Sequence, residues 1–342
     1  MNILPKIKSI LGKVIRNPWS FRAIGVSLFI MILMKINLHE AWYAIVHVDL
    51  TFVILSLVAQ LIALLFAAIR WQYIMRRFSI RLPFTSTLVY QLIGTAAALV
   101  TPGQVGEFVK VFYHRREGYP AGESFLSVLI DRLCDIFTLV LFGFIAISVI
   151  FRVPIPLAII LGISGITGVT LVFLFLRNKE ENGYKMAALL ARITPKAYKE
   201  MARKNVLQLT RKISEFNTRF LFSVAILSLT NFFFQLLRSY MLVLALHIQV
   251  PFTYFAMVVP LLRLVGLLPI SILGIGTRDI TAIYLLGRVG VSQPSALLVS
   301  TLTLITVQFQ TMAGLVAWWR NPLRFKKGER LTVESPIQEE LI

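Results

Sequence analysis

Long apolar runs are the feature that most constrains how this chain folds. Along its 342 residues, six predominantly apolar segments approach or exceed the roughly 20 residues that cross a bilayer as a helix. Hydrophobic residues make up 57% of the sequence and charged residues 15%, against roughly 25% charged in a soluble domain. A soluble domain of this size would need far more charge on its surface. The pattern predicts an all-α polytopic membrane protein that forms one integral membrane domain over residues 1–342.

The expected spans also predict an orientation in the membrane. The six full spans cover residues 21–38, 50–69, 124–150, 155–176, 219–247 and 295–319. Most of the 35 Lys and Arg residues lie between alternate spans, as they do when basic loops stay on the cytoplasmic side. Arg70, Arg76 and Arg77 form one such cluster, and residues 177–218 form a basic cytoplasmic loop with an amphipathic helix. We expect both termini in the cytoplasm, the chain in the cell (inner or plasma) membrane, and no nucleic-acid partner despite the net charge of +19.

Two glycine-rich turns interrupt apolar sequence at what the spans indicate is membrane depth. Residues 101–107 read TPGQVGE, and residues 270–279 read ISILGIGTRD. Inside hydrocarbon, unpaired backbone groups cost several kcal/mol, so irregular chain survives only where protein or water surrounds it. Each turn therefore predicts a re-entrant broken-helix hairpin whose free amides line a polar cavity. The turn residues, which end helices or permit unusual backbone angles, are Pro102, Gly103, Gly106, Pro269, Gly274 and Gly276.

The two hairpins are expected to belong to an inverted repeat. The tripeptide PFT opens both, at residues 83–85 and 251–253, and Glu107 corresponds to Asp279 after the turns. Three predicted spans separate the hairpins, so the hairpins enter from opposite faces of the membrane. Broken helices that meet near the midplane in inverted repeats are typical of transporters. We interpret residues 83–150 and 251–319 as the two repeats; a chance match of short motifs in apolar sequence is the alternative.

Polar and charged side chains within or beside the spans are the candidate functional residues. A charge at the centre of a span costs at least about 2.5–3.5 kcal/mol, so each needs a partner or a wet cavity. The substrate-binding set, which would hold a lipid headgroup or its phosphate, is Arg263, Arg278, Arg132, Arg238, Asn231 and Gln235. Arg263 and Arg278 are the first choices within it, because guanidinium grips oxyanions in a bidentate fork.

Four carboxylates accompany these groups. Asp131 and Asp135 lie one turn apart on the same helix face and are candidates for proton coupling. Glu107 and Asp279 are expected to anchor the hairpin tips or to orient the arginines. The alternative is that the cations and anions pair as internal staples and bind no ligand.

The remaining residues predict neither a cofactor nor catalysis. Four scattered histidines and a lone Cys134 indicate no metal site and no internal disulfide, and we expect His114 to be interfacial. The sequence contains no nucleotide-binding motif, no Ser/His pair and no convincing nucleophile. We therefore expect no catalytic residue, no enzymatic activity and no cofactor.

The order of three short motifs resembles a known family. PGQVGE (residues 102–107), SVLIDRLCD (127–135) and PISILGIGTRD (269–279) resemble the transmembrane region of lysylphosphatidylglycerol synthases, over about residues 15–322. That region also occurs alone, as flippase-like integral membrane proteins associated with varied lipids. The resemblance implies lipid translocation without synthesis, because the soluble aminoacyltransferase domain has no counterpart here. It carries over Pro102, Gly103, Gly106, Glu107, Asp131, Arg132, Asp135, Gly274, Gly276, Arg278 and Asp279, although Glu would be expected at position 279.

The leading functional hypothesis is a lipid translocase with a polar intramembrane cavity. Its substrate would be an anionic or aminoacylated phospholipid or a polyprenyl-phosphate-linked lipid. Transport would be passive or coupled to an ion gradient. One alternative is a lipid-binding partner of a separate lipid synthase or glycosyltransferase that does not itself transport. Another is an integral membrane enzyme acting on lipid phosphates.

Overall fold

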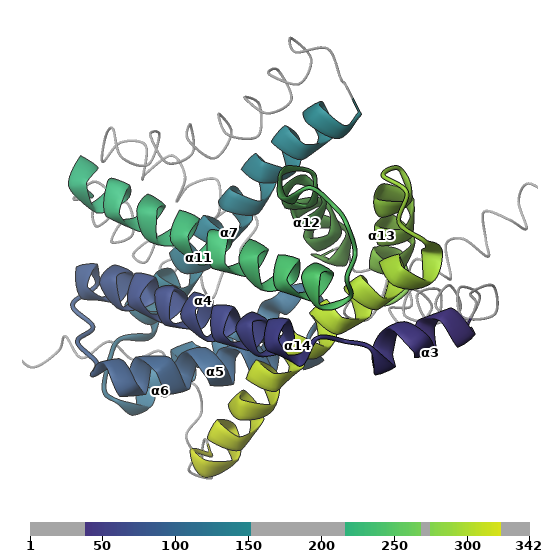
Figure 1. Ribbon diagram of the computed structural model, residues 1–342. Helices are drawn as coiled ribbons and strands as arrows, with labels where there is room; N and C mark the ends of the chain where they lie inside the picture. Colours follow the sequence, from purple (N-terminus) through teal and green to yellow (C-terminus); the bar gives the residue numbers. More distant parts are fainter. Residues whose placement is uncertain (1–37, 152–215, 268–273, 323–342) are drawn as a thin grey trace, which may run out of the picture.

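The computed structural model describes residues 38–151, 216–267 and 274–322, and within these ranges all regular secondary structure is helical (Figure 1). Pro269, the fourth expected span and nearly all of the first span and of the basic loop lie outside the described residues. The count of six spans, the cytoplasmic termini and the amphipathic helix therefore stay predictions. A short helix, α3 (Leu38–Val46), precedes the second span.

Four helices within the described ranges are long and apolar enough to cross a membrane. They are α4 (Leu50–Arg77), α7 (Ala121–Ile150), α11 (Thr218–Ala245) and α14 (Gln293–Arg320). Three of them match expected spans to within a few residues at each end. Helix α4 differs, because it continues past the expected end at residue 69 as far as Arg77. The prediction of an all-α membrane protein is confirmed at this level.

Helices α4 and α11 lie side by side and run antiparallel (Figure 1). At one end the Asp49 N–H donates to the Ala245 carbonyl over 3.0 Å, and at the other Arg77 Nη2 lies 3.5 Å from Asn217 Oδ1. Asp49 and Asn217 are also the N-caps, since each side chain accepts a backbone N–H of the first turn. The hydrogen bond from the Thr51 N–H holds the pKa of Asp49 below its usual value.

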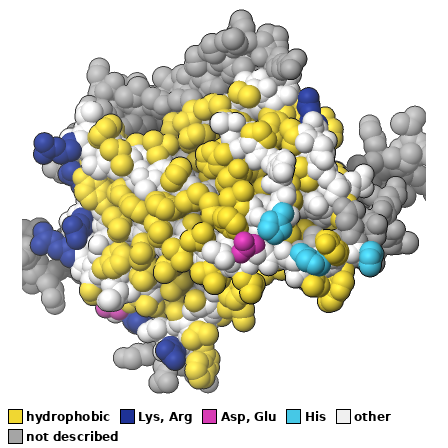
Figure 2. Space-filling view, viewed as in Figure 1, with side chains coloured by type: hydrophobic (Ala, Val, Ile, Leu, Met, Phe, Trp, Pro, Cys, Tyr) yellow, Lys and Arg dark blue, Asp and Glu magenta, His cyan; other side chains and the backbone are white. Residues whose placement is uncertain are grey.

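One end of the helix bundle carries most of the exposed basic side chains, and we call it the basic end. Tyr113 Oη donates to the Asn321 carbonyl over 2.7 Å, and Tyr119 Oη donates to the Arg81 carbonyl over 2.9 Å. These contacts bring together the ends of α4 and α14 and the start of α7. The exposed arginines of this end are Arg76, Arg77, Arg81, Arg115, Arg116, Arg219 and Arg320. In Figure 2 most dark blue side chains accordingly gather along the left and lower-left edge.

The outer faces of the long helices expose large apolar side chains. Ile54 on α4, Phe222 and Leu229 on α11, and Phe309 and Met312 on α14 are between 46% and 66% exposed. Figure 2 shows hydrophobic side chains as a broad band over this face, beside the basic edge. Soluble monomers rarely expose continuous apolar patches of this extent, so the band is the surface expected to meet lipid tails.

The first glycine-rich turn joins two helices that fold back on each other. Helix α5 (Phe84–Val100) leads through a 3₁₀ turn (Pro102–Phe108) into α6 (Val109–Arg116). Tyr90 Oη donates to Glu117 over 2.6 Å and Lys110 Nζ donates to Gln91 over 2.7 Å, which brings α6 antiparallel to α5. This first hairpin therefore begins and ends at the basic end of the bundle.

The helices on either side of the second turn pack together as a second hairpin, which begins and ends at the opposite end of the bundle. Helix α12 (Phe252–Leu267) is followed by α13 (Thr277–Gly287), and Tyr254 Oη donates to the Leu285 carbonyl over 2.7 Å. The guanidinium carbon of Arg288 lies 5.4 Å from the centre of the Phe151 ring, at the far end of α7. The two hairpins thus enter the bundle from opposite ends.

Packing between the hairpins and the long helices is reciprocal. Helix α5 lies along α14, whereas α12 lies along α7, so each hairpin packs on the long helix that follows the other hairpin. Glycine makes the first contact possible: a Cβ at Gly314 would lie 2.2 Å from the Leu92 carbonyl oxygen of α5. The charged side chains of both hairpin turns are held inside this arrangement.

Candidate functional site

Six charged side chains meet where the first hairpin turn contacts α4 and α7, and we call them the ion network. Its members are the cations Arg70, Lys110 and Arg132 and the carboxylates Glu107, Asp131 and Asp135. Three positive charges face three negative ones, so the network is neutral. Only Arg132 and Asp135 retain appreciable side-chain exposure, 17% and 27%.

Arg70 is the central cation of this network. Its Nε lies 2.8 Å from Asp131 Oδ1, and its Nη2 lies 2.7 Å from Asp135 Oδ1. Its Nη1 donates to Ser228 Oγ on α11 over 3.1 Å. One buried guanidinium therefore connects three of the four long helices.

Arg132 fastens the first hairpin turn to α7. Its Nη1 lies 3.3 Å from Glu107 Oε1, while its Nη2 lies 2.8 Å from Asp131 Oδ2 and 3.0 Å from Asp135 Oδ2. The second oxygen of Glu107 pairs with Lys110, which is fully buried. Glu107 therefore links the hairpin turn to Arg132 of α7 and to Lys110 of α6.

Three further arginines form a second group, the arginine cluster. Arg238 belongs to α11, Arg263 to α12 and Arg278 to α13, and each lies within electrostatic reach of at least one of the others. Arg238 is 5% exposed, whereas Arg263 and Arg278 are half-buried. These are three of the four arginines expected to bind substrate, and the fold brings them together from three consecutive helices.

The arginine cluster is poorly supplied with partners. Arg238 donates from Nη1 to Gln60 Oε1 over 2.9 Å, but its buried Nε has no hydrogen-bond acceptor in the described part of the chain. Arg278 donates to the hydroxyl and the carbonyl of Ser300 on α14. Arg263 has no hydrogen bond or ion pair to any residue that the structure describes. Unlike the ion network, this group holds charge that its neighbours do not neutralise.

Asp279 is the carboxylate beside the arginine cluster, yet it pairs with none of the three. Its Oδ2 accepts the Gly276 N–H over 2.9 Å and its Oδ1 accepts the Ser300 hydroxyl over 2.6 Å. It therefore closes the first turn of α13 and ties it to α14. Gly276 and Gly274 have φ of +85° and +79°, in the region that favours glycine.

Uncharged polar side chains connect the arginine cluster with the first hairpin. Gln60, which accepts from Arg238, also donates to Gln310 on α14, and Gln310 donates to Thr95 on α5 over 3.3 Å. The expected substrate residues Asn231 and Gln235 lie on the same helix as Arg238 and bond to each other over 2.9 Å. Polar groups thus run through the bundle from the second hairpin to the first.

Comparison with known proteins identifies the family to which the chain belongs. The family model of the lysylphosphatidylglycerol synthase TM region matches residues 21–314. The chain belongs to this family. It is also 25% identical, over 323 residues, to a UPF0104 membrane protein, PH1989, of Pyrococcus horikoshii; the match covers 87% of this chain and 95% of the relative. The resemblance seen in the sequence motifs is confirmed.

Two basic residues of this family member are buried inside the helix bundle, although their sequence positions indicate exposure at the cytoplasmic surface. Arg70 was expected in a cytoplasmic cluster, but α4 continues beyond it and its side chain is fully buried. Lys110 is also fully buried, with its Nζ 4.5 Å from the centre of the Trp71 ring. A rule that assigns every basic residue near a span end to the cytoplasm cannot recognise a buried one.

His114, which we expect to be interfacial, is buried inside the protein. Its ring is fully buried and stacks on Trp71 with the ring centres 5.2 Å apart. The cause is the fold of α6, which turns back against α4 and α5 and so buries one face of this short helix.

The first glycine turn of this family member is shaped by close backbone contact. A Cβ at Gly106 would lie 2.1 Å from the Ala97 carbonyl oxygen, and the Gly106 N–H donates to Thr101 Oγ1 over 2.6 Å. Pro102 and Gly103 open the 3₁₀ turn that carries Glu107 into the ion network. Only glycine at position 106 lets the turn close this tightly on α5.

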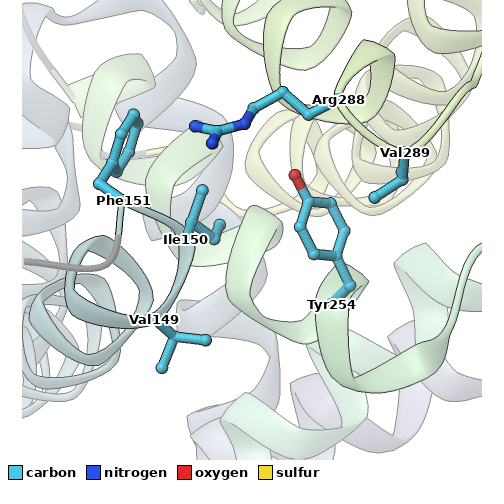
Figure 3. A pocket seen from close by; sticks show the side chains of 6 residues that line it. All are labelled: Val149, Ile150, Phe151, Tyr254, Arg288 and Val289. Atoms are coloured by element: carbon cyan, nitrogen blue, oxygen red, sulfur yellow. The ribbon is translucent and has the colours of Figure 1, made fainter.

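A pocket of about 380 Å³ lies elsewhere, at the end opposite the basic one (Figure 3). In Figure 3 the Tyr254 hydroxyl and the Arg288 guanidinium point toward the same space, with Phe151 beside it. Its lining residues are Val149, Ile150, Phe151, Tyr254, Arg288 and Val289. The pocket contains neither the ion network nor the arginine cluster, and we give it no part in the function.

Proposed function

We propose that this protein is a flippase-like lipid translocase. It moves an anionic or aminoacylated phospholipid, or a polyprenyl-phosphate-linked lipid, between the leaflets of the membrane. The observation that carries the proposal is the arginine cluster: three guanidinium groups inside an apolar bundle, with Asp279 as the adjacent carboxylate. Three cations held together inside the bundle with too few carboxylates to balance them are costly, and a bound phosphate offsets that cost.

The arrangement of the hairpins supports transport. The hairpins enter from opposite ends, and each packs on the long helix that follows the other. In an inverted repeat, such a pair of hairpins exposes a central site first to one face and then to the other. The acyl chains stay among the apolar outer faces while the headgroup passes along the polar interior.

The ion network has a different role in this proposal. Its charges balance, and its pairs hold the first hairpin turn on α7 and join α7 to α4. We assign it to fixing the hairpin, with Asp131 and Asp135 as the groups through which a proton gradient would act.

Translocation in proteoliposomes tests the proposal. Head-labelled phospholipids and polyprenyl phosphates are reconstituted with the full chain, and an impermeant quencher reports the lipid left in the inner leaflet, with and without an imposed pH gradient. We expect movement by the wild type and loss of movement in Arg263→Ala. Arg288→Ala, which removes an exposed arginine of the same hairpin, is the matched control and keeps full activity.

The same assay separates the alternatives. Lipid binding without movement would support a non-transporting partner of a lipid synthase or glycosyltransferase. Release of phosphate or sugar from the lipid would support a membrane enzyme. Asp131→Asn is run beside the wild type to test coupling: if the pH gradient accelerates both equally, Asp131 does not couple transport to protons.

A further inference from the structure

We infer that the arginine cluster selects a lipid whose headgroup ends in a phosphate monoester or diphosphate, and rejects one whose phosphate is balanced by an amino group. The inference rests on the proposed function and narrows its substrate. Three observations carry it: the local charge, the state of the nearby carboxylates, and the free donors.

Local charge favours a dianion. Arg238, Arg263 and Arg278 bring three positive charges, and Asp279 brings one negative charge, which leaves two positive charges unbalanced. Asp135 also acts on Arg263, but it belongs to the ion network, which is neutral by itself. A terminal phosphate carries about −1.5 to −2 at pH 7, whereas a phosphodiester carries a single negative charge. The terminal phosphate is therefore the headgroup that balances the cluster.

The nearby carboxylates are already engaged by other groups. All eight carboxylate oxygens of the ion network and of Asp279 are already paired with cations or hydrogen-bond donors. Asp131 and Asp135 each pair one oxygen with Arg70 and the other with Arg132. Glu107 pairs one oxygen with Arg132 and the other with Lys110. Asp279 accepts hydrogen bonds from the Ser300 hydroxyl and the Gly276 N–H. An aminoacylated headgroup would bring its cation toward three arginines and find no free carboxylate. Repulsion of this kind is an effective source of selectivity.

Free donors match a phosphate with several exposed oxygens. Arg238 Nε is buried without an acceptor in the described part of the chain. Arg263 forms no hydrogen bond or ion pair with a described residue, although Asp135 acts on its charge from a distance. A guanidinium offers a planar fork that binds two phosphate oxygens together. A terminal phosphate presents three such oxygens and a phosphodiester only two, so the terminal phosphate satisfies more of these donors.

Tail-labelled lipids test the selectivity, since their headgroups are unmodified. Fluorescent phosphatidic acid, phosphatidylglycerol, phosphatidylethanolamine and lysylphosphatidylglycerol are compared for binding to the detergent-solubilised full chain and, by albumin extraction, for translocation. We expect phosphatidic acid to bind at least about tenfold more tightly than phosphatidylglycerol, because hydrogen bonds to charged groups are strong. Lysylphosphatidylglycerol should bind the most weakly. Raising the pH from about 5.5 to about 7.5, across the second phosphate pKa near about 6, should strengthen phosphatidic acid binding alone.

Variants and a soluble phosphate complete the test. Arg263→Ala should remove the preference, Arg263→Lys should restore part of it, and Arg288→Ala should leave it unchanged. If the site takes a lipid, inorganic phosphate should compete only weakly with labelled phosphatidic acid. If inorganic phosphate competes as well as unlabelled phosphatidic acid, the lipid tail contributes nothing to binding, and the lipid assignment is overturned. Movement of all four lipids at the same rate would overturn the selectivity while leaving the translocase in place. Selective binding without movement would overturn the translocase and leave the selectivity.

Discussion

Both Nε and Nη2 of Arg70 lie 2.8 Å from Oδ1 of Asp131, and neither side chain is exposed. The contact joins α4 to α7 inside the bundle. A buried ion pair can contribute little net stability, yet removing one partner is strongly destabilising because it leaves the other charge buried and unpaired. The ion network is therefore where single substitutions should damage the fold most.

Arg70→Ala should lower the free energy of unfolding by about 3–5 kcal/mol, because Asp131 and Asp135 lose a shared cation. Thermal and denaturant unfolding of the detergent-solubilised protein measures this loss. Arg76→Ala, on the same helix but exposed, is the control and should change stability by less than about 0.5 kcal/mol. The double variant Arg70→Met with Asp131→Leu should lose clearly less unfolding free energy than the sum of the losses in the two single variants. Additive losses would show that the pair is not coupled.

Gly106→Ala should loosen the first hairpin. The new Cβ would lie 2.1 Å from a backbone oxygen of Ala97, which cannot move away as a flexible side chain could. Overpacking of this kind costs about 1–3 kcal/mol, and unfolding measurements would detect it. Gly287→Ala is the matched control, because nothing lies within 4 Å of its Cβ. Equal stability of Gly106→Ala and wild type would contradict the close contact.

Ser300→Ala should free the second hairpin turn from α14. The Ser300 hydroxyl accepts from Arg278 over 3.1 Å and donates to Asp279 over 2.6 Å, so one change removes one partner from each of two charged groups. We expect a loss of about 1–3 kcal/mol in unfolding free energy. Ser223→Ala, whose hydroxyl bonds to a carbonyl of its own helix, should be close to neutral. A similar effect for both serines would show that the turn does not depend on Ser300.

Hydrophobic length and helix-breaking glycines could be read directly from the sequence. They located four helices and the first turn, while the structure describes only residues 274–279 of the second turn. The partners of the charged side chains could not be read in the same way, because pairing depends on how helices distant in sequence pack. Arg70 and Gln60 illustrate this: each meets its partner only when α4 lies beside α11 and α7. Lys110 offered a local signal, since it lies three residues after Glu107 and so on the same helix face.

Arg116→Cys and Arg288→Cys, in a Cys134→Ala background, test the opposite orientation of the hairpins. The two arginines are exposed and occupy equivalent positions after the two turns. The first lies at the basic end of the bundle, whereas the second lies beside Phe151 at the other end. In intact cells, an impermeant thiol reagent should label Arg288→Cys and should reach Arg116→Cys only after the membrane is opened. Labelling of both from one side would rule out the inverted repeat, and with it the alternating exposure on which the translocase proposal depends.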